Sequence, residues 1–130
     1  MAPNPSRKLL LFLHRPGYEA LYQAASLAMT VGSCGGQAVV APFFGGLLTL
    51  CGKLAYADDP AALRSVELGL PDPRHMLGEG RHACGVKIVT TEPAIRLAGL
   101  ELDFVRPYVD EITGLATLWK QAEGAQVLYL

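Results

Sequence analysis

Lys8-Leu-Leu-Leu-Phe-Leu13 is the most informative segment for the fold class, because it is a strand-length apolar run that no polar residue interrupts after the lysine. A strand in a parallel sheet is buried on both faces, so it is expected to be hydrophobic at every position rather than at alternate ones. Residues 18–31 follow with good helix formers and with neither glycine nor proline. A buried strand followed by a helix is the repeating unit of an α/β fold.

The alternation of strands and helices continues along the whole chain. We expect further strands at residues 38–41, 86–89, 109–112 and 125–130. We expect helices at residues 46–54, 61–68, 73–83, 93–100 and 114–123, and one helical turn at 103–108. This order predicts a parallel sheet covered on both faces by right-handed crossovers. The 130 residues predict a single domain, with residues 1–7 as a flexible N-terminal segment.

Two aspartates mark helix starts. Asp59 precedes Pro60 and Asp72 precedes Pro73. Aspartate accepts hydrogen bonds from the first free N–H groups of a helix, and proline is tolerated at the first helical position. Both pairs therefore predict N-caps.

The composition excludes several classes of function. Hydrophobic residues make up 51% of the chain, charged residues 18%, and the net charge is −1. This content excludes a disordered chain, and it leaves no broad basic surface for nucleic acid. Three widely spaced cysteines, Cys34, Cys51 and Cys84, do not form a disulfide framework. We therefore expect reduced thiols and a cytoplasmic protein.

Residues 20–52 contain no charged side chain. Glycines, Pro42 and polar residues interrupt every window of about 20 residues, the length that a membrane-spanning helix needs. We interpret the segment as a buried helix, a turn and a buried strand, and expect no membrane association. A second implication is that another subunit covers part of it.

The residues that follow three of the expected strands form the candidate site. In an open parallel sheet, ligands bind at the carboxyl ends of the strands. The candidate ligand-binding residues are His14, Arg15, Tyr18, Phe43, Phe44, Thr90, Thr91 and Glu92. They suit a small pocket with a polar floor. Alternatively, the two phenylalanines belong to the core or an interface, and Thr91 or Glu92 caps a helix.

Other familiar sites are not predicted. The sequence has no GxGxxG motif, and Gly52-Lys53 lacks the flanking residues of a phosphate-binding loop. His75 and His82 share a helical face that Cys84 does not share, so we expect no metal site. GxSxG, the motif that surrounds the nucleophile of many hydrolases, is absent as well. We expect no cofactor.

Three segments resemble the DsrE/DsrF-like family of small sulfur-relay proteins. They are Gly85-Val-Lys-Ile-Val-Thr-Thr-Glu-Pro-Ala-Ile-Arg-Leu-Ala-Gly-Leu100, Val109-Asp-Glu-Ile-Thr-Gly-Leu-Ala-Thr-Leu118 and Gly124-Ala-Gln-Val-Leu-Tyr-Leu130. The strand at residues 8–13 and the helix containing Ala24-Ala-Ser-Leu-Ala28 also fit. The resemblance implies a three-layer α/β/α sandwich with a mostly parallel five-stranded sheet. It also implies a homo-oligomer, a trimer or a hexamer.

The resemblance places the family's persulfide-forming cysteine at Thr91. A threonine hydroxyl cannot carry a persulfide, and it is a poor nucleophile without an adjacent base. Our first hypothesis is therefore a diverged, non-catalytic DsrE-like module that binds a small ligand or a partner. The alternative is a sulfurtransferase or sulfur-relay protein that uses another thiol, with Cys34 as the best candidate. A third hypothesis is a small hydrolase or isomerase that uses Thr91, Glu92 and His14.

Overall fold

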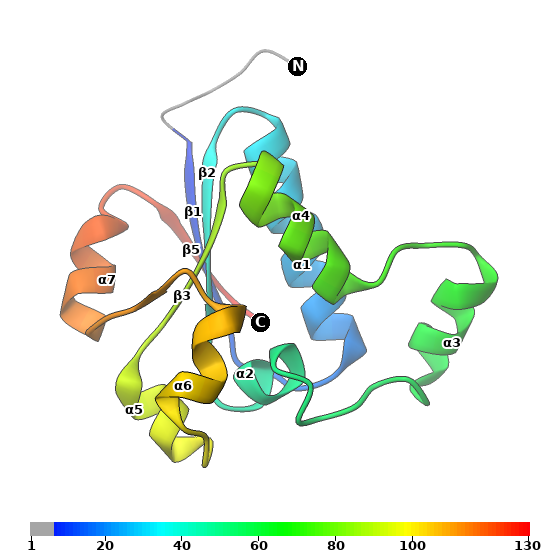
Figure 1. Cartoon of the computed structure of the whole chain (residues 1–130). Coiled ribbons are helices and arrows are strands. Elements are labelled where there is room, and N and C mark those ends of the chain that lie inside the picture. Colours follow the sequence, from blue (N-terminus) through cyan, green and yellow to red (C-terminus); the bar gives the residue numbers. More distant parts are fainter. Residues whose placement is uncertain (1–6) are drawn as a thin grey trace.

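This computed structural model describes residues 7–130 of the chain (Figure 1). All of the predicted flexible segment except Arg7 lies outside the described residues. The strands are β1 (Lys8–Leu13), β2 (Gln37–Pro42), β3 (Val86–Thr90), β4 (Glu111–Ile112) and β5 (Gln126–Tyr129). The helices are α1 (Tyr18–Ser33), α2 (Gly45–Leu50), α3 (Pro60–Glu67), α4 (Pro73–Ala83), α5 (Glu92–Leu97), α6 (Leu102–Val105), the 3₁₀ turn η1 (Arg106–Tyr108) and α7 (Leu115–Gln121).

The strands form one five-stranded parallel sheet in the order β4-β3-β2-β1-β5. In its centre, Leu10 of β1 lies opposite Val39 of β2 and Val127 of β5. Helices α1 and α4 cover one face of the sheet, and α7 lies on the other (Figure 1). The predicted three-layer α/β/α sandwich is confirmed.

The apolar run of β1 is divided between the two faces of the sheet. Leu9, Leu11 and Leu13 pack into the core beneath α1 and α4. Leu10 and Phe12 point to the opposite face, where α7 covers them. All five side chains are buried. Because successive side chains of a strand alternate between faces, a strand with helices on both sides needs an apolar residue at every position.

Successive strands are added to the sheet in two opposite directions from β1. From β1 through β2 and β3 to β4, each strand is added on the same side of its predecessor. The chain then returns through α7, and β5 pairs with the free side of β1. The connections that leave β1 and reach β5 therefore lie on opposite faces. This makes the boundary between β1 and β5 the topological switch point, the position at which open α/β sheets bind ligands.

The predicted helix starts are confirmed. The Asp59 carboxylate accepts a hydrogen bond from the backbone N–H of Ala61 at 2.8 Å, and that of Asp72 accepts one from Arg74 at 3.1 Å. Several helices end earlier than predicted. The helix expected at 46–54 ends at Leu50, shortly before Gly52, which has a positive φ, and the helix expected at 93–100 ends at Leu97, shortly before Gly99, which also has a positive φ.

The strand expected at 109–112 is only two residues long. At its start, the Asp110 carboxylate accepts a hydrogen bond from the backbone N–H of Ile88 at 2.7 Å. A side chain thus replaces the backbone carbonyl that a regular parallel strand would present there. Regular pairing begins only at Glu111.

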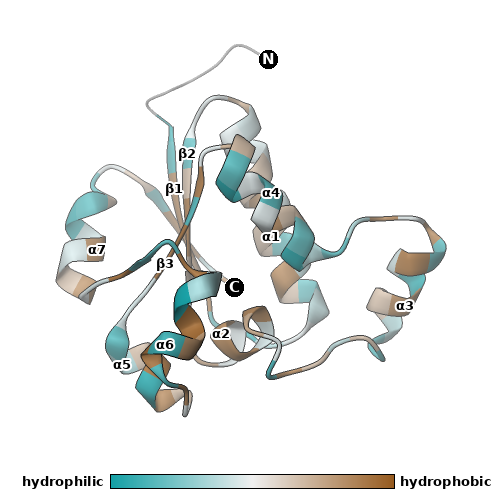
Figure 2. Ribbon diagram, viewed as in Figure 1, coloured by the Kyte–Doolittle hydropathy of each residue, from teal (hydrophilic) through white to brown (hydrophobic). Residues whose placement is uncertain are grey.

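The uncharged segment 20–52 is buried largely by its own chain. Leu21, Ala24 and Ala28 of α1 are completely buried, and Val40 lies in the centre of the sheet. The lack of charge therefore follows from the internal core and does not require a covering subunit. Apolar surface lies instead on α3, which stands away from the sheet and carries hydrophobic residues (Figures 1 and 2).

Candidate functional site

The loops at the carboxyl ends of the central strands are tied to one another. The backbone N–H of Phe43, after β2, donates to the carbonyl of Leu13 at 2.9 Å. The N–H of His14, after β1, donates to the carbonyl of Leu130 at 2.7 Å. The hydroxyl of Thr90 donates to the carbonyl of Pro42 at 2.7 Å. The predicted residues therefore lie along the same edge of the sheet.

Both predicted phenylalanines, Phe43 and Phe44, belong to an aromatic cluster at this edge. The ring of Phe44 lies 5.3 Å from that of His14 and 5.9 Å from that of Phe43. Phe43 contacts Phe12 at 5.6 Å, and Phe12 stacks on Tyr129 at 4.8 Å. The cluster thus runs across the ends of β1, β2 and β5. Phe12 and Phe43 form its covered centre, while His14, Phe44 and Tyr129 are exposed.

Phe44 has an unusual backbone conformation, with φ 52° and ψ −119°. This region strongly favours glycine, and a larger residue held there costs about 1–3 kcal/mol. The start of α2 holds Phe44 in this conformation, because the backbone N–H of Gly46 donates to the carbonyl of His14 at 3.1 Å. A Cβ on Gly46 would lie only 2.1 Å from the Leu13 carbonyl oxygen. The strained turn directs the Phe44 ring towards His14 at the edge of the sheet.

Thr90, Thr91 and Glu92 have structural roles in this conformation. Thr90 is completely buried, and its hydroxyl donates to the carbonyl of Pro42 at the end of β2. The buried hydroxyl of Thr91 accepts a hydrogen bond from the backbone N–H of Ala94 at 3.3 Å and so caps α5. Glu92 pairs with Arg96 one helical turn later, at 2.8 Å. These contacts match the capping alternative that the sequence left open.

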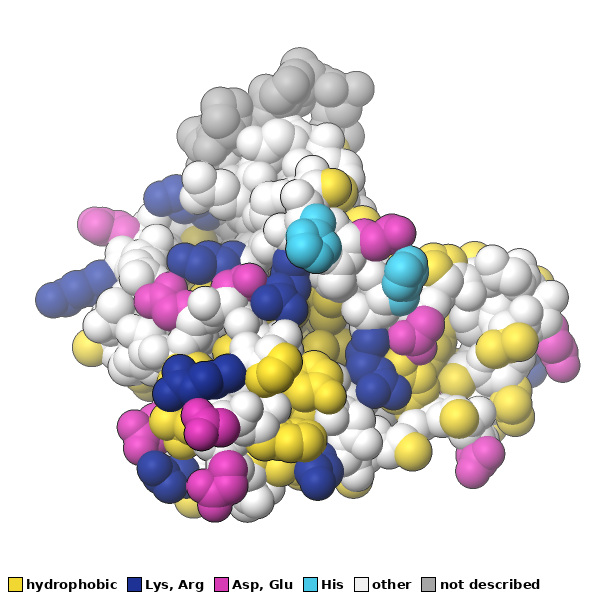
Figure 3. All heavy atoms as spheres, viewed as in Figure 1, with side chains coloured by type: hydrophobic (Ala, Val, Ile, Leu, Met, Phe, Trp, Pro, Cys, Tyr) yellow, Lys and Arg dark blue, Asp and Glu magenta, His cyan; other side chains and the backbone are white. Residues whose placement is uncertain are grey.

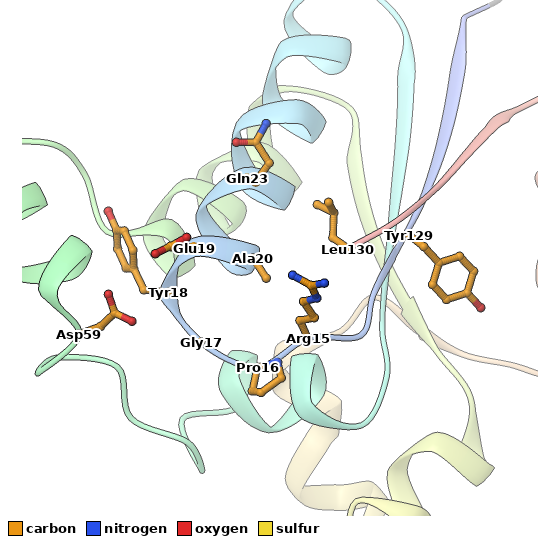
Figure 4. Close-up of a pocket in the computed structure, with 10 residues that line it drawn as sticks. All are labelled: Arg15, Pro16, Gly17, Tyr18, Glu19, Ala20, Gln23, Asp59, Tyr129 and Leu130. Atoms are coloured by element: carbon orange, nitrogen blue, oxygen red, sulfur yellow. The ribbon is translucent and has the colours of Figure 1, made fainter.

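A cleft at this edge lies at the switch point between β1 and β5 and has a volume of about 660 Å³ (Figure 4). From the predicted set it contains Arg15 and Tyr18. Arg15 extends between the start of α1 and Leu130, which follows β5 (Figure 4). Tyr18 and Asp59 lie on the other side of α1 in this view, and Tyr129 points away from Arg15. The cleft therefore surrounds the first turn of α1.

Charges of both signs line the switch-point cleft. Arg15 supplies a guanidinium, and Glu19 and Asp59 supply carboxylates. Among the ion pairs of residues 7–130, none involves these three side chains. The N-cap of α1 is Gly17, which has no capping side chain, and its own N–H donates to the Thr49 hydroxyl at 3.1 Å. The positive end of the α1 dipole therefore faces the cleft beside Arg15.

Several residues of the cleft could not be found from the sequence. Glu19 and Gln23 had a weak signal, since they begin the helix that follows the first strand. Asp59 lies in a loop 40 residues after Glu19, and the sequence around it indicates only that it caps α3. Tyr129 joins the cleft because β5 pairs with β1, and local sequence does not reveal strand order.

The three cysteines lie away from the switch-point cleft. Cys51 is buried, and burial raises the pKa of its thiol to about 11. Cys34 follows α1 and Cys84 follows α4, so both lie near the amino ends of the strands, β2 and β3, that come next. Neither cysteine lies at a helix N-terminus, where reactive cysteines are often found.

The sequence matches no protein-family model, and no curated protein matches it. The DsrE/DsrF-like resemblance therefore stays a prediction. No helix within residues 7–130 has both the length and the apolar character that a membrane crossing requires.

Proposed function

We propose that this chain is a diverged DsrE-like module without catalytic activity, which binds a small polar ligand and assembles into a homo-oligomer. The position of the switch-point cleft is the main support for ligand binding. A volume of about 660 Å³ suits a small molecule. The cleft lies where the crossovers diverge, and in open parallel sheets this is the usual ligand site.

The lining of the cleft indicates the chemistry of the ligand. Arg15 and the uncapped start of α1 favour an anionic group, such as a carboxylate or a phosphate monoester. Glu19 and Asp59 are hydrogen-bond acceptors and favour donor groups, such as hydroxyls or an amine. The cleft therefore offers an anion-binding part on the Arg15 side of α1 and hydrogen-bond acceptors on the other side of this helix.

The absence of catalysis is proposed from the contacts of the predicted residues. A nucleophile must be able to reach the substrate and needs an adjacent base. The hydroxyls of Thr90 and Thr91 are buried, and each is occupied by an internal hydrogen bond. Glu92 is paired with Arg96. These contacts argue against the hydrolase or isomerase hypothesis as well.

We expect Arg15→Gln to weaken ligand binding at least tenfold, because a charged hydrogen bond contributes about 1.5–3 kcal/mol. Small carboxylates and phosphate monoesters would first be screened by thermal shift. The dissociation constant of the best compound would then be measured by calorimetry for the wild type and the variant.

Arg7→Gln is the matched control for this measurement. Arg7 is exposed and directly precedes β1, so it lies at the opposite edge of the sheet. The control should bind like the wild type. Equal affinity of Arg15→Gln and the wild type would refute the proposed site, and so would the absence of any binding compound in the screen.

The proposed oligomer is supported by the surface of α3. Ala62 and Ser65 face the protein and are buried, but Leu63, Val66 and Leu68 face outwards. Val66 is 78% exposed. Neighbouring exposed apolar residues on a projecting helix are typical of a protein–protein contact. A second copy of the chain is the proposed partner, in a trimer or a hexamer.

Light scattering coupled to size exclusion should give a mass of three or six times 13.9 kDa. Val66→Lys should lower this mass, because a buried, unpaired ammonium group opposes association. Leu97→Lys is the control, since Leu97 on α5 is similarly exposed, at 75%. A wild type that remains monomeric at micromolar concentration would contradict the oligomer.

The alternative function, a sulfur relay through Cys34, is favoured by one observation. Cys34 is partly exposed, so a persulfide donor can reach it. It follows the last turn of α1, however, and so does not lie at a helix N-terminus, where reactive cysteines are often found. Thiol reactivity separates the two functions, because a relay needs one cysteine that reacts much faster than the others.

A further inference from the structure

A second cavity lies on the face of the sheet that α1 and α4 cover, between α4 and η1, and has a volume of about 170 Å³. Leu50, Leu77 and Ile88 give it an apolar, deeply buried wall. Arg74, Arg81 and Tyr108 contribute polar groups. In Figure 3, hydrophobic side chains lie in a hollow beside α4, with Lys or Arg side chains on either side. The lining includes two arginines and no acidic residue.

Arg74 has hydrogen-bonding capacity left for a ligand. Its guanidinium lies over the ring of Tyr56, 5.1 Å from the ring centre, and its Nε donates to the Tyr56 hydroxyl at 3.3 Å. No carboxylate of residues 7–130 forms an ion pair with it. The nearby Asp72 carboxylate instead accepts bonds from the Tyr56 hydroxyl and from the backbone of α4. The two terminal nitrogens of Arg74 can therefore bind an anion.

The other cation of the cavity is held in place. Arg81 bonds to one oxygen of Asp110 through Nε at 3.1 Å and through Nη2 at 3.0 Å. Lys53 adds positive charge nearby, because its Nζ lies 4.7 Å from the centre of the Phe104 ring. That ring packs 5.9 Å from Tyr108. Arg74 is thus the free charge, and Arg81 and Tyr108 shape the opposite wall.

We propose that this cavity binds a small organic carboxylate. The apolar wall holds the hydrocarbon part, and the guanidinium of Arg74 binds the carboxylate in the bidentate geometry that arginine favours. Inorganic phosphate has no apolar part and cannot use Leu77 or Ile88. A neutral alcohol of similar shape cannot form the bidentate ion pair with Arg74. The cavity shares no lining residue with the switch-point cleft, so this inference does not depend on the proposed function.

Benzoate is a suitable probe, with benzyl alcohol and inorganic phosphate as comparisons. Titration of ¹⁵N-labelled protein should shift the amide signals of Gly78 and Ile88 in a saturable manner. Benzyl alcohol and phosphate should each bind at least tenfold more weakly than benzoate. Arg74→Gln should weaken benzoate binding at least tenfold, whereas Arg96→Gln, a change in an exposed ion pair on α5, should leave it unchanged.

A second variant keeps the test decisive if Arg74→Gln does not fold. Gly78 lines the cavity, and a Cβ placed on it meets no atom within 4 Å. Gly78→Leu should therefore fold, fill the cavity and abolish benzoate binding.

The proposal is overturned if benzoate does not bind, or if benzyl alcohol or phosphate binds equally well. It is also overturned if a folded Arg74→Gln or Gly78→Leu variant binds benzoate like the wild type, or if Arg15→Gln weakens benzoate binding. The last outcome would place benzoate in the switch-point cleft instead.

Discussion

Replacing Gly32 by alanine is expected to destabilise the folded protein by about 3 kcal/mol, at the upper end of the usual range for overpacking. Gly32 lies in α1 where the end of α4 crosses it, and an added Cβ would sit 1.5 Å from the carbonyl oxygen of Cys84. A backbone carbonyl cannot rotate away as a side chain can. The two helices must therefore separate, although their contact covers much of one face of the sheet.

Gly78→Ala is the matched control, because it makes the same change in a helix interior. Gly78 lies in α4, and a Cβ there meets nothing within 4 Å. Alanine is favoured over glycine in a helix by about 1 kcal/mol, so this variant should be more stable than the wild type. Urea unfolding followed by circular dichroism measures both changes. If Gly32→Ala is as stable as the wild type, the close contact of α1 and α4 is wrong.

Cys51 should be alkylated more slowly than Cys34 and Cys84, by a factor of about 100 or more. Burial raises the pKa of Cys51 from 9.0 to about 11, and each pKa unit lowers the thiolate fraction at neutral pH tenfold. The thiolate is the reactive form, and burial also blocks access of the reagent. At pH 8, iodoacetamide should modify Cys34 and Cys84 first and Cys51 last. Mass mapping of digested samples over time gives the three rates.

Two controls complete the cysteine experiment. In urea, where the chain is unfolded, all three thiols should react at similar rates. Cys51→Ala should remove the slow phase and leave the other two rates unchanged. Fast modification of Cys51 in the folded protein would contradict its burial.

The same experiment tests the alternative function. A sulfur relay needs one thiol that reacts much faster than an ordinary cysteine. Hyper-reactive Cys34, together with added sulfur mass after treatment with a persulfide donor, would support the relay and contradict the non-catalytic proposal. Slow and ordinary rates at Cys34 and Cys84 would support the ligand-binding module.

The class of fold could be predicted from local sequence, and so could the edge of the sheet at which the candidate residues lie. The uninterrupted apolar run of β1 can be satisfied only between two helical layers, which fixes a parallel sheet. Asp59 and Asp72 fix helix starts through contacts within three residues. These features depend on periodicity and on short-range hydrogen bonds, which local sequence records directly.

Which side chains line the cleft depends on the tertiary structure. Arg15 and Tyr129 line the same cleft because β5 pairs with β1, and Tyr18 and Asp59 line its far side, across the first turn of α1. Thr91 is buried, and its hydroxyl caps α5. Strand order, the path of a long connection and the direction of each side chain depend on packing between distant residues. No local pattern encodes that packing, so the sequence located the edge of the sheet and the folded chain selected the residues that line its cleft.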